Sequence, residues 1–349
     1  MKTFETLLRR CSVLVVCGLW CCMPVQSQSG SEYPRTPWGG YPYPASYDAE
    51  IADPDVHRVL FENGDIMFIE VANPPGLGVR MHGHPYPSVF ARDTGSGQGV
   101  AGIPLEDTHL DPTNPFAGEG WGQGPAPLGL EFPRCTTAPP EAPHKPINHG
   151  TVPVHFYRIE FRRLDGEGFR SRWKDWYPWM LKPGTPATNL QLGTALGPKW
   201  SEEWPYPLPY DSVLAAPNNY RLLYEDGHVR LLEVTVRPGE TTPPHGNPYA
   251  SVLAFNTVAV DEREIVDTKL DPASPLNSFG VGRGPAPSVF NMTVPTCTTV
   301  APQAPHTIRN NSSIPLHYYR IEFKRVDGND FPSNWSEWYP WMKYMKNMR

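Results

Sequence analysis

Hydrophobic residues in this chain gather in short runs separated by turn signals. In the first half, residues 59–61 and 66–71 flank Asn63-Gly64, and in the second half a similar pair of runs flanks Asp226-Gly227. Asn-Gly and Asp-Gly between runs rich in β-branched and aromatic residues are strong signals for a tight β-hairpin. The pattern therefore predicts that each half opens with a hairpin.

Each half also ends in a strand pattern, at residues 154–162 and 316–325, after a long segment rich in glycine and proline. No run inside either half has the period of an amphipathic helix of three turns. Short strands and many turns, without long helices, are typical of sandwiches and barrels. The sequence thus predicts an all-β protein.

The two halves are copies of one unit. The segment 82–89 (HGHPYPSV) returns at 245–252 (HGNPYASV), 163 residues later, and both copies close on Trp-Tyr-Pro-Trp-Met. A fixed offset over most of a chain indicates a duplicated structural unit of, here, roughly 140 residues. We expect an N-terminal domain at 42–180, a linker at 181–204 and a C-terminal domain at 205–342.

Composition narrows the classes of function. The chain has 349 residues and a net charge of −6, with a mean hydropathy of −0.44. No basic surplus supports nucleic-acid binding. Proline accounts for 43 residues, about one in eight against a usual ~5%, which disfavours long helices.

Residues 1–27 have the features of a secretory signal. Lys2, Arg9 and Arg10 give a positive start, and a short apolar run with a small-residue cleavage site follows. The run is too short for a spanning helix. We expect a secreted or periplasmic protein with no membrane part after cleavage; the alternative is an N-terminal membrane anchor.

Cys135 and Cys297 stand at matching positions, each in the phrase Cys-Thr-Thr, while the other four cysteines lie within residues 1–27. An oxidising compartment allows a disulfide, but a bridge requires Cα atoms within about 7 Å. Equivalent positions of two domains need not be that close. We therefore expect two buried free thiols, with a disulfide as the alternative.

Three tryptophans close each copy, and we expect them to cap or latch each unit. They are Trp173, Trp176 and Trp179 in the first copy and Trp335, Trp338 and Trp341 in the second. Because edge strands need covering, we also expect the two units to pack against one another as one pseudo-twofold body.

Histidines supply the candidate chemistry. His82 and His84 are two residues apart on a predicted strand, so both project to one face. His144 follows in the phrase Ala-Pro-His, with Asn148 four residues later. Three facing imidazoles would leave open positions on Fe(II), Mn(II) or Zn(II). We predict a metal site at these three histidines; the alternative is a proline-rich surface turn around His82-Gly83-His84.

At these residues the chain resembles the cupin superfamily, and the doubled unit resembles a bicupin. Gly76 stands six residues before His82, as the first cupin motif requires, and Gly239 stands six before His245. Both copies keep the His-x-x-x-Asn element of the second motif. The resemblance covers most of the chain after residue 27. It implies two tandem jelly-roll β-barrels with His82, His84 and His144 as metal ligands in the first barrel.

Two departures from the cupin motifs change the expected metal. The glutamate that follows His-x-His in cupins is missing, with Ser88 and Val89 about where it belongs, and Glu141 and Gln303 replace a glycine of the second motif. A three-histidine site resembles those of cupin thiol dioxygenases and gentisate-type dioxygenases, which use Fe(II). The resemblance favours iron, with Mn or Zn as alternatives, over the four-ligand Mn(II) sites of oxalate decarboxylases and germin-like proteins.

In the second copy, His245, Asn247 and His306 occupy the ligand positions. Two histidines and an amide would bind metal weakly, so we expect this site to be empty or vestigial. His155 and His317 recur on the last strand of each copy. We expect them to be core histidines with polar partners rather than catalytic groups.

Three functions fit these patterns. The first is a secreted Fe(II)-type oxidoreductase that acts on a small molecule, although no residue stands out as a general base. The second is a non-catalytic barrel protein that binds a small ligand or a metal. The third is a structural bicupin like the seed-storage proteins. Fold does not decide among them, and each is compatible with a homo-oligomer.

Overall fold

The computed structural model describes residues 41–95, 105–111, 121–124, 133–165, 169–181, 204–257, 260–274, 276, 283–284 and 294–348. The expected signal segment and residues 182–203 of the expected linker lie outside these ranges. Within them, no helix is both long enough and apolar enough to cross a bilayer. Both halves of the duplicated chain fall within one compact unit.

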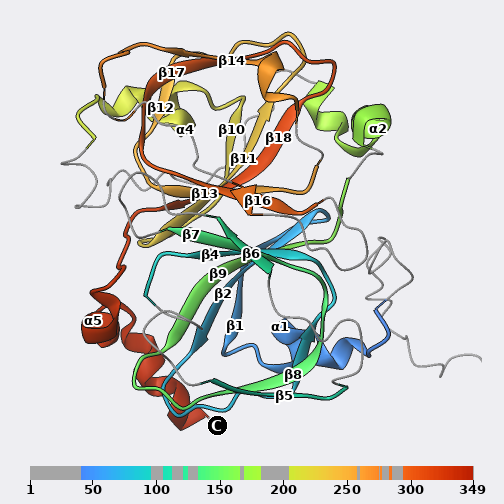
Figure 1. The fold of residues 1–349 in the computed structure, drawn as a ribbon, viewed down its shortest axis with the longest axis vertical. Coiled ribbons are helices and arrows are strands. Elements are labelled where there is room, and N and C mark those ends of the chain that lie inside the picture. Colours follow the sequence, from blue (N-terminus) through green and yellow to red (C-terminus); the bar gives the residue numbers. More distant parts are fainter. Residues whose placement is uncertain are drawn as a thin grey trace, which may run out of the picture. The chain divides into compact units, whose positions relative to one another are not determined.

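The first half folds into two sheets that wind as a jelly-roll barrel (Figure 1). The larger sheet has the order β1-β2-β9-β4-β7-β6 and the smaller has the order β3-β8-β5. From β2 to β9 the chain passes back and forth between the two sheets, as in a double-sheet jelly roll. The strands are β1 (His57–Glu62), β2 (Ile66–Asn73), β3 (His82–His84), β4 (Ser88–Arg92), β5 (Leu105–His109), β6 (Trp121–Gly124), β7 (Arg134–Ala138), β8 (Glu141–Asn148) and β9 (Val154–Phe161).

The second half repeats this topology strand for strand. Its sheets have the orders β10-β11-β18-β13-β16-β15 and β12-β17-β14. The strands are β10 (Tyr220–Glu225), β11 (Val229–Val236), β12 (His245–Asn247), β13 (Ser251–Phe255), β14 (Ile265–Lys269), β15 (Arg283–Gly284), β16 (Thr296–Val300), β17 (Gln303–Asn310) and β18 (Leu316–Phe323). The prediction of an all-β protein with two tandem, duplicated jelly-roll barrels is confirmed.

Helices in the described part of the chain are short, and no α-helix there exceeds eight residues. They are η1 (Ala45–Tyr47), α1 (Ala49–Ala52), α2 (Phe169–Trp176), η2 (Pro178–Leu181), η3 (Leu208–Tyr210), α4 (Ser212–Ala215), η4 (Glu262–Glu264), α5 (Phe331–Trp338) and η6 (Pro340–Met348). The density of proline explains this, since proline lacks the N–H that a helix interior needs.

Each barrel opens with the predicted hairpin. The Asn63 side chain accepts hydrogen bonds from the backbone N–H groups of Asp65 (2.8 Å) and Ile66 (2.9 Å). Asp226 does the same for the corresponding turn of the second barrel. These side chains fix the turn, and so fix where β2 begins at Ile66 and where β11 begins at Val229.

The two barrels share one apolar core. Ile66 and Phe68 on β2 belong to the same buried cluster as Val229 and Leu231 on β11. Met67, which points to the opposite face of β2, belongs to a different cluster. The expectation that the two units bury their faces against one another is confirmed.

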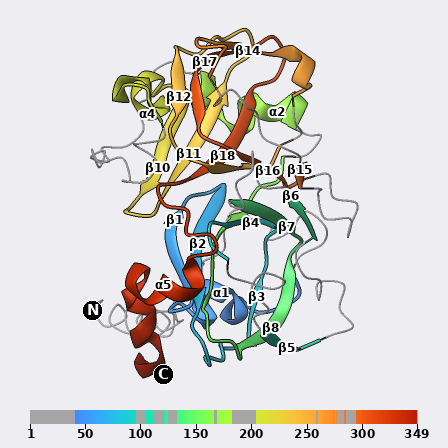
Figure 2. The same cartoon turned by 60° about the vertical axis from the view of Figure 1, so that its left-hand side comes forward.

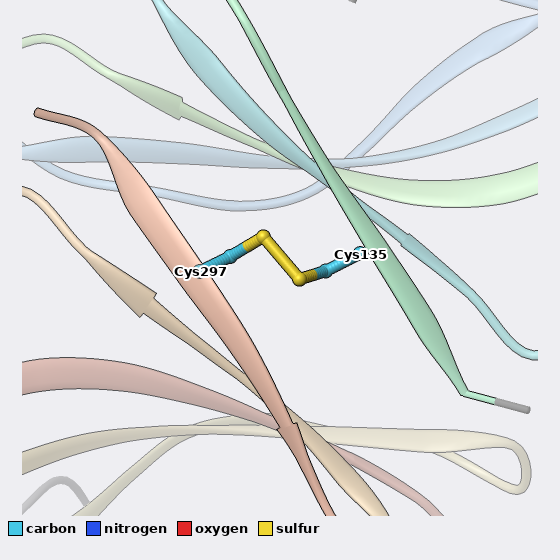
Figure 3. Close-up of a disulfide and its surroundings, with 2 residues drawn as sticks. All are labelled: Cys135 and Cys297. Atoms are coloured by element: carbon cyan, nitrogen blue, oxygen red, sulfur yellow. A yellow bond between two sulfur atoms is a disulfide. The ribbon is translucent and has the colours of Figure 1, made fainter. Parts of the chain in front are cut away.

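Cys135 on β7 and Cys297 on β16 form a disulfide across this shared core (Figure 3). Their Cα atoms are 6.3 Å apart, within the distance that a bridge requires. The expectation of two free thiols is therefore wrong. The two repeats meet face to face at corresponding strands, so equivalent positions come together instead of lying far apart.

The segment after β9, which we call the first arm (residues 169–181), packs on the second barrel (Figure 2). Its Tyr177 ring lies 4.7 Å from that of His317, and the Asn256 amide donates to the Tyr177 hydroxyl (3.3 Å). Trp173 is buried in the same cluster.

The segment after β18, which we call the second arm (residues 331–348), packs on the first barrel (Figure 2). Tyr339 is fully buried, and its ring lies 4.2 Å from that of His155. Each arm therefore caps the other repeat's barrel. The expected caps exist, but the two copies exchange them.

Candidate metal centre

The three predicted metal ligands of the first barrel lie together on the smaller sheet. His82 and His84 on β3 are both buried, and β3 pairs with β8 so that His82 lies opposite His144. The ring centroids are 4.6 Å apart for His82 and His144, 5.2 Å for His82 and His84, and 5.9 Å for His84 and His144. The sequence spacing thus correctly identified residues that the fold brings together.

A fourth histidine, which sequence reasoning missed, belongs to the same cluster. His57 is the first residue of β1 and is buried. Its ring centroid lies 4.3 Å from that of His82 and 5.4 Å from that of His84. One possible ligand atom from each of these three histidines lies within 4.8 Å of the others. The sequence carried a signal for it: the residue 163 positions later is Tyr220, so His57, like His84, is a histidine that the second copy does not have.

Hydrogen bonds hold these rings in one orientation. The Nδ1 atoms lie 2.8 Å from the Arg80 carbonyl for His82, 2.8 Å from Glu160 Oε1 for His84, 3.0 Å from Asp107 Oδ2 for His144 and 3.3 Å from the Asp53 carbonyl for His57. Each acceptor takes the proton of Nδ1, so the lone pair of each ring resides on Nε2. Metal-binding histidines in proteins show this arrangement of a second, orienting partner. The His144 Nε2 atom is buried and has no hydrogen-bond partner among the described residues.

Burial keeps the central imidazoles neutral. It lowers the pKa of His82 well below 6.5, and the nearby His57 and His144 rings lower this pKa further. Burial also lowers the pKa of His84 well below 6.5, with Arg158 as the next cause. Only the neutral ring can bind a metal, so these side chains are ready to bind one at neutral pH.

Carboxylates surround this neutral cluster. Arg158 is the guanidinium beside it and contacts Glu141 (2.7 Å) and Glu160 (3.1 Å). Burial raises the pKa of Glu160 to about 8, and Arg158 opposes the rise. Glu160 contacts Nδ1 of His84, so it orients this ring and does not take the place of the glutamate missing near Ser88. The buried imidazoles of His57, His82 and His84 could hold a metal ion. The two neighbouring acidic side chains and the single guanidinium leave room for its positive charge.

No family model and no curated protein matches this chain. Among solved structures it is similar to a cupin domain from Bordetella pertussis Tohama I, at 20% identity over 30% of this chain and 91% of that one, with a TM-score of 0.20. It is also similar to a variant of salicylate 1,2-dioxygenase from Pseudoaminobacter salicylatoxidans in complex with gentisate, at 11% identity over 81% and 77%, with a TM-score of 0.20. Oxalate decarboxylase from Lactobacillus farciminis in a formate complex gives 14% identity over 75% and 77%, with a TM-score of 0.18.

TM-scores this low carry no weight by themselves. The strand order does, because both halves wind as jelly rolls and both carry their histidine motif on the same two strands of the smaller sheet. The described part of the chain thus has the fold of two tandem jelly-roll barrels.

In the second barrel, side chains of the chain itself contact the positions that correspond to the proposed ligands. His245 and His306 still face one another, with ring centroids 4.6 Å apart. However, the Tyr220 hydroxyl lies 2.8 Å from Nε2 of His245, the nitrogen that a metal would need. Asn247 donates to Gln303 Oε1 at 3.2 Å. No group of three metal-donor side chains occurs in the part of this barrel that the structure describes.

The carboxylate that orients His144 has a counterpart with a different partner in the second barrel. Asp107 corresponds to Asp267, whose carboxylate forms an ion pair with Lys269 at 2.8 Å. His306 instead has Nδ1 2.8 Å from the Ala304 carbonyl. Burial, with a smaller contribution from the Lys269 ammonium, lowers the pKa of His306 to about 4. A cation beside the ring opposes metal binding.

The recurrent histidines of the last strands have the structural role expected of them. His155 is buried against Tyr339 of the second arm, with Nε2 3.2 Å from Glu70 Oε1. Although burial lowers its pKa, hydrogen bonds with Asp93 and Glu70 raise it to about 9. His317 pairs with Glu233 in the same way at 3.1 Å. Both are core histidines with polar partners, as predicted.

Proposed function

We propose that the first barrel binds one divalent metal ion through His82, His84 and His144 and acts on a small molecule. The observation that carries this is the orientation of the rings: each Nδ1 has an acceptor, and each Nε2 belongs to a cluster that is buried and rich in imidazole. The Nε2 atom of His144 is buried without a hydrogen-bond partner among the described residues, and buried polar atoms require partners.

The donor set favours iron, zinc, copper or nickel, because imidazole suits these metals, whereas Mn and Mg prefer carboxylates. Among the described residues, the group of possible ligand atoms that lie within 4.8 Å of one another contains histidines and no carboxylate. The resemblance to three-histidine cupin dioxygenases favours iron among these metals. When bound, the metal would act as a Lewis acid that holds and polarises the substrate. The chain's own residues orient the imidazoles through Glu160 and Asp107 and keep them out of water.

Secretion is part of the proposal. The sequence features of residues 1–27 suggest it, and the disulfide between Cys135 and Cys297 supports it, because such bonds persist mainly in oxidising compartments.

Metal content tests the proposal directly. The protein should be purified, loaded anaerobically with Fe(II) and desalted, and we expect about one ion per chain. His84→Ala should lose this ion, whereas His149→Ala should keep it, because His149 is half exposed and lies outside the cluster. Absence of bound Fe, Mn or Zn from the unaltered protein would refute the proposal.

A non-catalytic binding protein is the second candidate. The filled second barrel favours it, since it shows that this fold persists in the same chain without a metal site. Oxygen uptake by the iron-loaded protein with thiol, diphenol and diketone substrates separates the two. Uptake that His84→Ala abolishes indicates an enzyme, and stable iron without uptake on any of these substrates indicates a binder.

A further inference from the structure

We propose that His57 is a fourth ligand of the metal, in the role that the glutamate missing after His84 would otherwise have. This inference rests on the proposed function and goes beyond it, because the cupin motifs assign no ligand to the first strand of the barrel. His57 lies 25 residues before His82 in sequence. The hairpin of β1 and β2 brings it to the histidine cluster.

Distance supports this assignment. Ligand atoms of His57, His82 and His84 lie within 4.8 Å of one another. Two nitrogens that bind one ion at about 2.1 Å can be at most about 4.2 Å apart. Closing a gap of a few tenths of an ångström requires only small rotations of the rings.

The same short turn orients His57 and His82. The Asp53 carbonyl accepts from the backbone N–H of His57 (3.0 Å) and lies 3.3 Å from its Nδ1. The Asp53 carboxylate accepts from the backbone N–H of Arg80 (2.8 Å), whose carbonyl accepts from Nδ1 of His82 (2.8 Å). Asp53 is fully buried. One acidic residue thus sets the direction of two imidazoles, which is the role of the outer partner in metal sites.

The second barrel provides an internal control. Tyr220 occupies the position of His57, with the same register against its neighbouring strand. Its hydroxyl reaches Nε2 of His245, the counterpart of His82, at 2.8 Å. A side chain at this position therefore points at the ligand nitrogen of the neighbouring histidine. In the first barrel the side chain there is itself a metal donor.

Four neutral imidazoles have a chemical consequence. They leave the full positive charge of a divalent ion uncompensated by the ligands and leave two positions of an octahedral ion open. Such a centre suits a small anionic ligand that binds through two atoms. A carboxylate in the ligand set would have reduced this preference by cancelling one charge.

The test uses Co(II), which can be followed by its visible absorption and titrated in competition with a chelator. We expect His57→Ala to keep Co(II) but to bind it at least tenfold more weakly, with a changed visible spectrum. Added imidazole should restore the original spectrum, because it can occupy the space that the ring leaves. His57→Tyr, which copies the second barrel, should bind Co(II) more weakly still and should not respond to imidazole. His149→Ala is the matched control and should match the unaltered protein.

The outcomes separate this inference from the proposed function. If His57→Ala binds Co(II) with unchanged affinity and spectrum, His57 is not a ligand, but the three-histidine site stands. If the unaltered protein binds no Co(II), both fail. Thermal unfolding of the metal-free variants shows whether each is folded. If His57→Ala does not fold, His57→Tyr provides the test in its place, because the second barrel already folds with tyrosine at this position.

Discussion

Removal of the Cys135–Cys297 disulfide should destabilise the protein markedly while leaving its fold intact. The double variant Cys135→Ala/Cys297→Ala deletes the bridge and buries no new polar group. Both cysteines lie in the shared core of the two barrels. That core does not depend on the bond, so the barrels should still pack together in the variant.

The size of the effect follows from the length of chain that the bond closes. The two cysteines are 162 residues apart in sequence. In the chain-entropy model a loop of this length lowers the entropy of the unfolded chain by an amount worth about 5 kcal/mol at 25 °C. Measured losses for native disulfides run from about 2 to 5 kcal/mol. We expect the free energy of unfolding to fall by an amount in this range.

Urea unfolding of the chain from residue 28 onward provides the assay, because this chain contains no other cysteine. The unaltered protein should lose stability when dithiothreitol is added, and the double variant should not respond to it. Two thiols that titrate in the unfolded, unreduced protein would show that the bond does not form. A loss below about 1 kcal/mol on removing a bond that does form would show that the unfolded chain is not constrained as the calculation assumes.

Two further predictions concern the exchanged arms. Tyr339→Ala should lower the free energy of unfolding by roughly 3–5 kcal/mol, as for other buried aromatic residues. Tyr344 lies on the same arm but is exposed, so Tyr344→Ala should change this free energy little. Equal effects of the two substitutions on urea unfolding would contradict the packing of the second arm. Burial raises the pKa of Asp165 to about 6, so the folded state holds this proton more tightly than the unfolded state and stability should fall as pH rises from about 4 to about 6. Asp165→Asn still offers an acceptor to the Tyr177 hydroxyl and should flatten this part of the stability profile by on the order of 2–3 kcal/mol; an unchanged slope would contradict the assignment.

The fold was predictable because the sequence states it twice. The hairpin signals at Asn63-Gly64 and Asp226-Gly227 and the strand patterns at 154–162 and 316–325 are local, and each has a counterpart in the other copy. The three histidines were predictable for a related reason. The spacing of His82 and His84 on a strand decides their common face, and the motif around His144 supplied the third.

What was missed depends on contacts between distant segments. Nothing local to Cys135 indicates that it meets its own counterpart, since that requires the two repeats to pack face to face. The exchange of the arms could not be predicted for the same reason, because the sequence of a tryptophan-rich cap does not indicate which of the two barrels it covers. His57 was missed because it lies outside the cupin motifs, on a strand that the sequence showed only as part of a hairpin.

The differences between the two barrels form a pattern in charge. The carboxylates of Asp107 and Glu160 have counterparts, Asp267 and Glu322, in the second barrel. Two cations of the second barrel contact these carboxylates and have no charged counterpart in the first barrel. Lys269 contacts Asp267 and corresponds to His109. Arg230 contacts Glu322 and Asp211 and corresponds to Met67.

Two positive side chains have thus entered the barrel that lacks the histidine set, while the first barrel keeps the corresponding carboxylates beside neutral imidazoles. Arg158 is the cation beside Glu160 in the first barrel, as Arg320 is beside Glu322 in the second, but no counterpart of Lys269 or Arg230 joins it, because His109 and Met67 occupy those positions. A divalent ion supplies the same two charges that Lys269 and Arg230 supply in the second barrel. We therefore expect the metal proposed for the first barrel to take the place of these two cations, since nearby positive charge stabilises buried carboxylates.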